Sequence, residues 1–515
     1  MDWADLGKTG FMTVYTVLLG VVSLYGLHRY ALVYLYWRHR HKVPVPAGHF
    51  DELPVVTIQL PMFNERFVAR RIIEKICQID YPRDKLHIQV LDDSTDDTTE
   101  IARRTSEEMR RCGFDVEFIH RENREGFKAG ALGNGMKTAK GEFISIFDAD
   151  FVPKPDFLMN TIHYFTDPKV CVVQSRWDHL NREDSLLTKS QAIFLDGHFA
   201  IEHVGRNRSG RFMSFNGTGG TWRREAIDDA GGWRHDTLTE DLDLSYRAQL
   251  KGWKFIFLPD LISPAELPPD MSGFKAQQFR WTKGGAQNAI KLLPKVLLSK
   301  APLKVKVEAF FHLTAFTVHM FMFGLVTLMF PAMYLQYLPL ESGTIWRGMV
   351  DMSIFALATM SATVFYCASQ GALKGNWRSA LKYLPMMMAL GVGLCVSNTK
   401  AILEAWFGRK SDFVRTPKYG EGKPAHAQTA YLDQREKRKR NWLPAAEFLM
   451  GLYMSGCLLC CIFDVRSAMT APFLAIFAFG FFYVSITSFQ AELATRPRRK
   501  KTHQLSTAAS GQKAE

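Results

Sequence analysis

The chain has 515 residues, a formal net charge of +13 and 47% hydrophobic residues. This length allows two or three domains with full cores, and the eight irregularly spaced cysteines exclude a disulfide framework. The positive charge collects beside apolar runs and shows no basic groove with interleaved aromatic residues. That pattern excludes nucleic acid as a partner and favours a lipid bilayer.

Five apolar runs are long enough to cross a bilayer as helices. They cover residues 11–27, 310–335, 349–368, 443–463 and 469–489. The basic stretches beside them are predicted to face the cytosol. A further apolar run at 384–396 is short and has basic stretches on both sides. It is predicted to be an interfacial or re-entrant segment on the cytosolic surface.

The segment between the first two apolar runs alternates strand and helix signals. Strands are predicted at 55–61, 86–93 and 116–121 and at "FISI" (143–146), with helices at 67–79, 98–112 and 130–138. This alternation predicts a doubly wound α/β sheet, in which ligands bind beyond the carboxyl ends of the strands. Asp92 and Asp93 end one of these strands, and Asp148 and Asp150 follow another.

Asp148 and Asp150 offer hard oxygen ligands for Mg²⁺ or Mn²⁺, which bind through one or two carboxylates together with substrate phosphates. The alternative is that both residues cap the turn before "PKPDF". Two neighbouring motifs support the first interpretation, because "PMFNE" (61–65) and "DDST" (92–95) also follow strands and are placed to contact a base and ribose. Lys128 in "EGFKAG" is placed to meet phosphate charge.

Two later motifs carry further candidate groups. Glu240 and Asp241 in "TED" stand before a helical pattern, where one carboxylate is placed to act as a general base. The alternative is an acid that only stabilises the helix N-terminus. "QQFRW" (277–281) sets Arg280 beside Trp281, which suits a phosphate and the flat face of a sugar ring, or is a surface pair.

Taken in order, these motifs resemble the processive family 2 glycosyltransferases of the cellulose synthase superfamily. The likeness is closest to the plant cellulose-synthase-like A and C proteins, the β-mannan and β-glucan backbone synthases. It rests on "QVLDDSTD", "IFDADF", "VQSRW", "FNGTGGTWR", "EDLDLSYRAQLKGWKF", "ELP" and "QQFRW" and is strong over about residues 54–290. The resemblance implies an α/β GT-A catalytic domain, a nucleotide-sugar donor and a divalent metal.

The resemblance also implies a role for each matching residue. The donor would be bound by Glu65, Asp93, Lys128, Asp148, Gln277 and Arg280, and the metal by Asp150. The general base would be Asp241, with Glu240 beside it. The acceptor would lie on Trp281, Phe215, Gly217 and Thr218. The implied reaction is an inverting displacement that forms a β-linkage.

A cytosolic gating loop is the last implied element. In cellulose synthases it reads roughly FxVTxK, and here "FVRTPK" contributes Phe413, Thr416 and Lys418, with Arg415 in the place of valine. The loop would close over bound donor. The alternative is a solvated basic linker.

These inferences give the following domain organisation. An N-terminal transmembrane anchor (1–45) leads to a cytosolic GT-A domain (50–300), two transmembrane helices (305–370), the interfacial segment and gating loop (375–442), two more transmembrane helices (443–490) and a basic cytosolic tail (491–515). The protein is expected in the bacterial cytoplasmic membrane, or in the Golgi membrane of a eukaryote.

The expected function is hexose transfer from UDP-glucose or GDP-mannose to a growing β-linked polysaccharide, with translocation across the membrane. Single-sugar transfer to a membrane lipid such as diacylglycerol is the nearer alternative. A transporter with a nucleotide-sensing domain is the more distant one, and it is disfavoured because the apolar runs carry few charges away from their ends.

Overall fold

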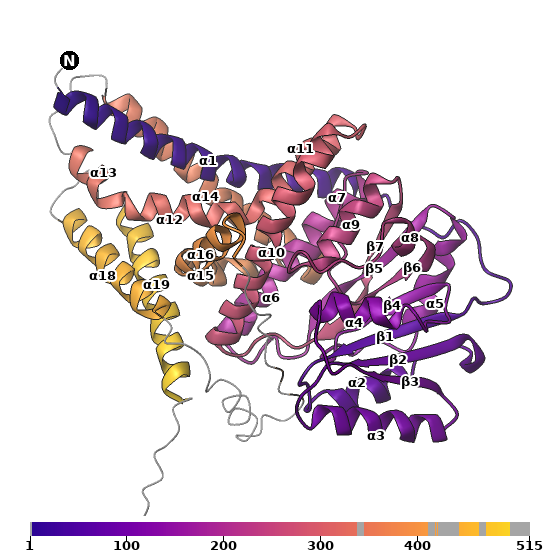
Figure 1. The fold of residues 1–515 in the computed structure, drawn as a ribbon. Coiled ribbons are helices and arrows are strands. Elements are labelled where there is room, and N and C mark those ends of the chain that lie inside the picture. Colours follow the sequence, from indigo (N-terminus) through magenta and orange to yellow (C-terminus); the bar gives the residue numbers. More distant parts are fainter. Residues whose placement is uncertain are drawn as a thin grey trace, which may run out of the picture.

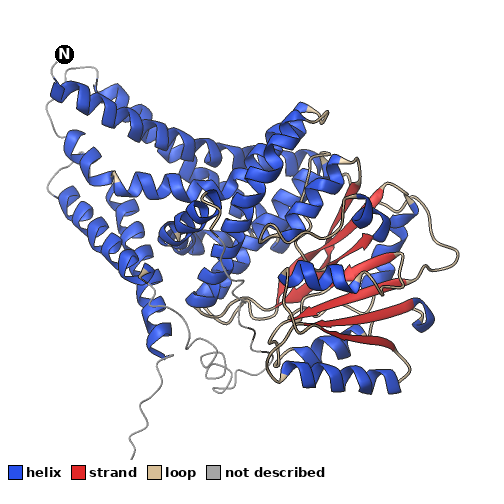
Figure 2. Cartoon of the chain, in the orientation of Figure 1, coloured by secondary structure: helices blue, strands red, loops and turns tan. Residues whose placement is uncertain are grey.

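The computed structural model describes residues 3–336, 344–409, 418, 420, 442–462 and 470–494. These residues form an α/β domain on one side and a group of long helices on the other (Figures 1 and 2). Helix α1 (Trp3–His39) runs along the helical part and leads into the first strand of the sheet (Figure 1).

The strands of the described residues form one sheet in the order β3-β2-β1-β4-β6-β5-β7. They are β1 (Val56–Met62), β2 (Leu86–Asp92), β3 (Asp115–His120), β4 (Phe143–Ile146), β5 (Val170–His179), β6 (Gly220–Arg223) and β7 (Lys254–Ala265). The first four lie within a few residues of the predicted strands. Their mutual pairings are parallel, whereas β6 runs antiparallel to both β4 and β5.

Helices cover both faces of the sheet, which confirms the predicted α/β class. One core is formed with α2 (Ala69–Ile76), α3 (Thr98–Arg111) and α5 (Phe157–Ile162). The other is formed with α4 (Phe127–Gly135), α8 (Arg224–Asp229) and α9 (Glu240–Leu250). The parallel strands β1, β2 and β4 therefore end at one common edge, where the predicted acids follow them.

Strand β1 shows how a strand buried on both faces keeps polar side chains. Val56, Ile58 and Leu60 enter the first core, while the residues between them are polar and equally buried. Gln59 Nε2 donates a hydrogen bond to Gln89 Oε1 on β2 at 3.0 Å. This hydrogen bond across the strands offsets part of the desolvation cost of burying the Gln59 amide.

The remaining helices connect the sheet to the helical part. They are α6 (Leu186–Gly197), a π-helix (His198–His203), α7 (Val204–Arg208), α10 (Met271–Leu298), α11 (Leu303–Thr314), α12 (Val318–Thr327), α13 (Met329–Gln336), α14 (Thr344–Lys374), α15 (Leu384–Gly393), α16 (Cys395–Trp406), α18 (Leu443–Ile462) and α19 (Ala471–Ala494). Helices α1 and α14 pack side by side, as do α18 and α19 (Figure 1).

Four stretches of helix among the described residues are long and apolar enough to cross a membrane: Leu6–His39, Leu303–Thr327, Leu443–Cys461 and Ala471–Leu493. Each overlaps one of the five predicted spans. The remaining predicted span, 349–368, lies in α14, which is not among these four within the part of the chain that the structure describes.

The predicted interfacial segment 384–396 lies in a bent pair of helices. Trp377–Gly393 and Cys395–Trp406 meet at an angle of 42°, as in a broken span or a re-entrant loop. The bend falls at Leu394, where α15 ends and α16 begins. Its position relative to a membrane stays a prediction.

Helix α10 is joined to neighbouring helices by two ion pairs, one buried and one partly buried. Lys275 Nζ donates to both carboxylate oxygens of Glu447 on α18, at 2.7 Å each. Lys283 Nζ donates to Glu404 Oε2 on α16 at 2.9 Å. Removing one partner of a buried pair leaves a charge without compensation, so these contacts fix α10 in one position against α16 and α18.

Candidate active site

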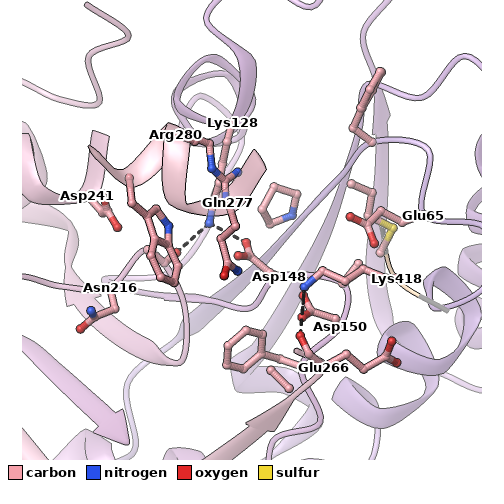
Figure 3. A pocket seen from close by; sticks show the side chains of 18 of the residues that line it. Glu65, Lys128, Asp148, Asp150, Asn216, Asp241, Glu266, Gln277, Arg280 and Lys418 are labelled. Carbon is pink, nitrogen blue, oxygen red and sulfur yellow. Dashed lines mark hydrogen bonds and ion pairs between the residues drawn. The ribbon is translucent and has the colours of Figure 1, made fainter. Parts of the chain in front are cut away.

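A cavity lies at the carboxyl ends of β1, β2 and β4, and α10 forms one wall of it (Figure 3). It brings together most of the predicted site residues from segments far apart in the sequence. They are Glu65, Asp93, Lys128, Asp148, Asp150, Gly217, Glu240, Asp241, Gln277, Arg280, Trp281 and Lys418. The cavity is also lined by Arg124, Trp177, His179, Asn216 and Glu266.

Lys128 ties the strand-end acids to the predicted acceptor segment. Its Nζ donates to Asp148 Oδ1 at 2.5 Å and to the backbone oxygen of Gly217 at 2.9 Å. Burial alone would lower the pKa of Lys128, but Asp148 and Glu240 raise it above its ordinary value. The side chain is therefore a fixed cation at the centre of the cavity.

Asp150 is paired with Lys418. The two side chains form an ion pair, and Lys418 Nζ also lies 3.4 Å from the backbone oxygen of Glu266. Arg71 Nη2 donates to Glu266 Oε1 at 2.7 Å, which holds the Glu266 side chain at the rim. In Figure 3 the Lys418 side chain ends beside the Asp150 carboxylate. Asp150 thus faces a position that accommodates positive charge.

The donor set around Asp150 fits a divalent ion that arrives with its substrate. Among the described residues, no group of three His, Cys, Asp or Glu side chains is placed to hold a metal without other ligands. Mg²⁺ in nucleotide-binding enzymes takes one or two carboxylates and completes its shell with phosphate oxygens and water. Asp150, with Asp148 in the same cavity, provides that minimum.

The far end of the cavity contains Glu65 and Asp93. The guanidinium of Arg121 binds Asp93 through two hydrogen bonds, Nε to Oδ1 at 2.7 Å and Nη2 to Oδ2 at 2.5 Å. Such a bidentate pair holds the carboxylate in one orientation. Arg124 and Phe63 line the same cavity. The Arg124 guanidinium lies 3.3 Å from the centroid of the Phe63 ring, and the two groups together form a flat surface with a polar part.

Asp241 lies in the first turn of α9, on the side of the cavity away from Asp150. Its Oδ1 accepts the backbone N–H of Leu242 at 2.8 Å. Burial, and then the neighbouring charge of Glu240, raise the pKa of Asp241 to about 7, although Lys128 and Arg280 oppose the rise. A carboxylate with a pKa near neutrality is suited to take a proton in a reaction.

Helix α10 presents three predicted residues to the cavity because of their spacing. Gln277, Arg280 and Trp281 stand at positions i, i+3 and i+4, which share one face of a helix. The helix begins after Asp270, whose Oδ1 accepts the Gly273 N–H at 2.8 Å. One face of α10 thereby carries an amide, a guanidinium and an indole toward the cavity.

Helix α10 also positions the segment that precedes Asp241. Asn288 Nδ2 donates to the backbone oxygen of Thr239 at 3.0 Å and to its Oγ1 at 2.9 Å. Gly284 allows the close approach, since a Cβ atom there would lie 2.6 Å from Thr239 Oγ1 and 2.9 Å from its backbone nitrogen. Gly284 and Asn288 lie beyond the end of "QQFRW" on the same helix, so the motif does not contain them.

We expect Gly284→Ala to reduce turnover by about 10-fold or more, because the added methyl group pushes Thr239, and with it Asp241, away from α10. Donor affinity should change much less. Steady-state kinetics with donor titration would measure both. Gly391→Ala on α15 is the matched control, since a Cβ atom there meets nothing within 4 Å. Equal effects of the two substitutions would contradict this role of Gly284.

Only one of the three predicted acceptor residues of "FNGT" lines the cavity. Gly217 lines the cavity, and its φ of +82° and the 3.0 Å between an added Cβ and Asp241 Oδ2 both require glycine. Phe215 is fully buried against Trp222, and Thr218 Oγ1 accepts the backbone N–H of Asp148 at 2.9 Å. Neither side chain lines the cavity, and Asn216 does so instead.

Three further lining residues lie within the motifs quoted above. Trp177 belongs to "VQSRW", Asn216 to "FNGT" and Glu266 to "ELP". Their inclusion in the motifs was the available signal, but strand alternation had to be known before their side chains could be assigned to the cavity. Of the gating residues, Phe413 and Thr416 lie outside the described residues, while Lys418 is the partner of Asp150.

Comparison with known proteins identifies the family that this chain resembles. Residues 54–284 match the family "Glycosyltransferase like family 2". A probable glucomannan 4-beta-mannosyltransferase 7 of Oryza sativa subsp. japonica is 44% identical over 254 residues, which cover 48% of this chain and 43% of the rice protein. Glucomannan 4-beta-mannosyltransferase 2 of Arabidopsis thaliana is 35% identical over 418 residues, 77% of this chain and 75% of the relative.

Among solved structures, a mannosyltransferase of Pyrobaculum calidifontis in complex with GDP-Man and Mn2+ matches with a TM-score of 0.52 and 22% identity. The match covers 76% of this chain and all of that chain, and it shows a shared fold. The predicted GT-A architecture is thereby confirmed. With the motifs in order and the long Arabidopsis match, the chain belongs to glycosyltransferase family 2, in the cellulose synthase-like group that includes the plant glucomannan mannosyltransferases.

Proposed function

We propose that this protein is an inverting hexosyltransferase that extends a β-linked polysaccharide with mannose from GDP-mannose. The observation that carries the proposal is the position of Asp241. This carboxylate, whose pKa is raised to about 7, lines the same cavity as Trp281 and as the cations Lys128 and Arg280. A base, a sugar-binding face and diphosphate-binding cations thus converge. Mannose is favoured because relatives of this chain are named mannosyltransferases.

In the proposed reaction, Asp241 removes the proton from the attacking hydroxyl of the acceptor sugar as its oxygen bonds to the anomeric carbon of the donor. The bond from that carbon to the diphosphate oxygen breaks, and the nucleoside diphosphate leaves. Lys128 and Arg280 stabilise the charge that develops on the diphosphate. Trp281 supports the acceptor ring and keeps the hydroxyl in line with the breaking bond.

Asp150 is the proposed ligand of Mg²⁺ or Mn²⁺, and the bound ion would neutralise charge on the diphosphate. Seven carboxylates and four Lys or Arg side chains line the cavity. Arg121 and Arg71 supply counter-charges to two of the carboxylates, Asp93 and Glu266, so the charges are nearly balanced. A diphosphate that enters together with a divalent cation would preserve this balance. Lys418 forms an ion pair with Asp150, so its ammonium group and a divalent ion would compete for the same carboxylate.

At the nucleotide end, Glu65 and Asp93 are the proposed contacts to base and ribose. The bidentate pair with Arg121 leaves Asp93 oriented toward the cavity in which it lies. Gln277 is proposed to contact the diphosphate from α10. The four candidate spans and the basic segments beside them support a multi-pass membrane protein with its catalytic domain in the cytosol and with product translocation across the membrane.

We expect purified full-length protein to release GDP from GDP-mannose in the presence of manganese and a manno-oligosaccharide, and to form β-1,4-linked product. Nucleotide release with GDP-mannose, UDP-glucose and ADP-glucose, followed by linkage analysis of the product, tests this directly. Preference for UDP-glucose would change the donor. A product with one sugar on diacylglycerol would replace polymer synthesis by lipid glycosylation. No release with any donor would refute the proposed function.

A further inference from the structure

Asn216 is the side chain of the "FNGT" segment that lines the cavity, and two histidines hold its amide. Asn216 Oδ1 lies 2.5 Å from His203 Nε2, and Asn216 Nδ2 lies 2.9 Å from His198 Nε2. The backbone N–H of Asn216 donates to Gln174 Oε1 at 3.2 Å. Both ends of the amide and its backbone are therefore fixed by protein groups.

The two histidines face Asn216 together because of a local change in helix geometry. His198–His203 is a single π-helical segment between α6 and α7. Hydrogen bonds in a π-helix join residues five apart, so its wider turn brings positions i and i+5 toward one side. The imidazole centroids of His198 and His203 are 4.3 Å apart. Short π-helical segments occur frequently at functional sites.

The neighbours of the histidines determine which way the amide points. His198 Nδ1 lies 3.0 Å from Glu202 Oε2, so Nδ1–H donates to this carboxylate and Nε2 accepts from the Asn216 amide. Burial would raise the pKa of Glu202, but Arg206 and His198 lower it, so the carboxylate is charged. Glu202 is in turn held by Arg206 Nη1 at 3.0 Å.

His203 completes the arrangement from the other side. It is fully buried, and burial lowers its pKa well below the ordinary value, so the ring is neutral. Because an amide oxygen only accepts, His203 Nε2–H donates to Asn216 Oδ1. Asn216 then keeps one N–H and one lone pair of Oδ1 for a group in the cavity. A sugar hydroxyl, which both donates and accepts, matches that pair.

The place of Asn216 in the chain sets which sugar it can reach. Its neighbour Gly217 lies directly against Asp241, since a Cβ atom on Gly217 would be 3.0 Å from Asp241 Oδ2. In Figure 3, Asn216 and Asp241 lie on the same side of the cavity, away from Asp150 and Lys418. A hydroxyl bound by Asn216 would therefore lie near Asp241, where the proposed reaction places the acceptor sugar, and away from Asp150 and Lys418.

We propose that Asn216 recognises a hydroxyl of the terminal acceptor sugar, and that His198 and His203 are positioning residues that hold its amide in the binding orientation. This inference rests on the proposed function, because it requires a glycan acceptor. It adds a specificity-determining residue to the site. The alternative is that the three side chains only satisfy one another in the core.

A double-mutant cycle separates the two possibilities. The KM for a manno-oligosaccharide acceptor and the Kd for GDP-mannose are measured for wild type, Asn216→Ala, His203→Leu and the double variant. We expect Asn216→Ala and His203→Leu each to raise the acceptor KM by about 3- to 10-fold, the effect of one neutral hydrogen bond, with an unchanged donor Kd. His203→Leu should have no further effect when Asn216 is already Ala.

Two more variants exclude a general loss of packing. His203→Gln keeps an N–H donor for Asn216 and should restore the acceptor KM to near the wild-type value. His87→Leu removes a buried histidine of β2, whose Nδ1 lies 3.2 Å from Thr57 Oγ1, and should leave the acceptor KM unchanged. Acceptors that each lack one hydroxyl on the terminal sugar should include one that wild type binds poorly and that Asn216→Ala does not distinguish.

Several results would overturn the inference. They are an unchanged acceptor KM in Asn216→Ala, additive effects in the double variant, or an equal loss of donor and acceptor binding. Failure of the proposed function is a separate result, because wild type would then transfer mannose to no acceptor. A His203→Leu variant that does not fold is replaced in the cycle by His198→Gln, which offers an amide oxygen as an acceptor to Asn216 Nδ2, and by His198→Leu, which offers none.

Discussion

We expect Asp241→Asn to lower the rate of transfer by about 100- to 10,000-fold while GDP-mannose binds within about three-fold of its wild-type affinity. An amide cannot take the proton of the attacking hydroxyl, and general-base catalysis contributes about 10² to 10⁴ in rate. The substitution is nearly isosteric, so the Leu242 N–H keeps an acceptor. Single-turnover product formation and donor titration on the same preparation would measure the two quantities.

The pH dependence provides a second test of the same residue. Asp241 acts as a base in its deprotonated form, and its pKa is raised to about 7. Transfer should therefore increase as the pH rises from 6 to 8 and level off above that. Glu240→Gln removes a negative charge that helps to raise the pKa of Asp241, so this variant should reach its plateau at a lower pH.

Glu240→Gln is also the control for the assignment of the base. If Glu240 were the base, Glu240→Gln would abolish transfer and Asp241→Asn would retain a large part of it. A wild-type rate that does not change between pH 6 and pH 8 would contradict proton removal by a carboxylate with a raised pKa.

The second large effect is expected for Asp150→Ala, which should lower turnover by at least about 100-fold and make the residual activity independent of added Mg²⁺ or Mn²⁺. A metal bound at a diphosphate contributes several kcal/mol of transition-state stabilisation, and each 1.36 kcal/mol corresponds to a factor of ten. Metal titration of activity, together with direct measurement of Mn²⁺ binding in the presence of GDP, would test both statements.

Two variants sharpen the assignment of Asp150. Lys418→Met removes the ammonium group that is paired with Asp150, and it should raise the affinity for Mn²⁺ in the absence of donor. Asp148→Asn should weaken donor binding through the loss of its charged pair with Lys128, but should keep a saturable metal titration. A normal metal response in Asp150→Ala would show that another group binds the ion.

The sheet and the metal-side acids were accessible from the sequence because each depends on local pattern. Alternating strands and helices predicted β1 to β4, and parallel strands bring their carboxyl ends to one edge, so Asp93, Asp148 and Asp150 had to lie near one another. The spacing of Gln277, Arg280 and Trp281 likewise requires one helix face. These inferences need no knowledge of distant contacts.

The parts that were not predicted depend on long-range packing. The antiparallel direction of β6 follows from how "FNGTGGTWR" returns to the sheet, and no periodicity reveals it. The strand and turn geometry buries Phe215 and Thr218 and leaves Asn216 in the cavity. The motif alone does not show which of the three side chains faces the cavity. The π-helical segment that pairs His198 with His203 has no signature in hydrophobic spacing.

The contacts that hold α10 in place determine whether the α/β domain can be produced without the rest of the chain. Gln277, Arg280 and Trp281 stand between Lys275 and Lys283, whose partners Glu447 and Glu404 come from the last third of the sequence. A fragment that ends near residue 300 would contain every acid of the cavity, yet its α10 would have lost both counter-charges and much of the surface it packs on. The α/β domain is therefore not expected to be active on its own. The helices that hold α10 in place are synthesised only after the whole of this domain.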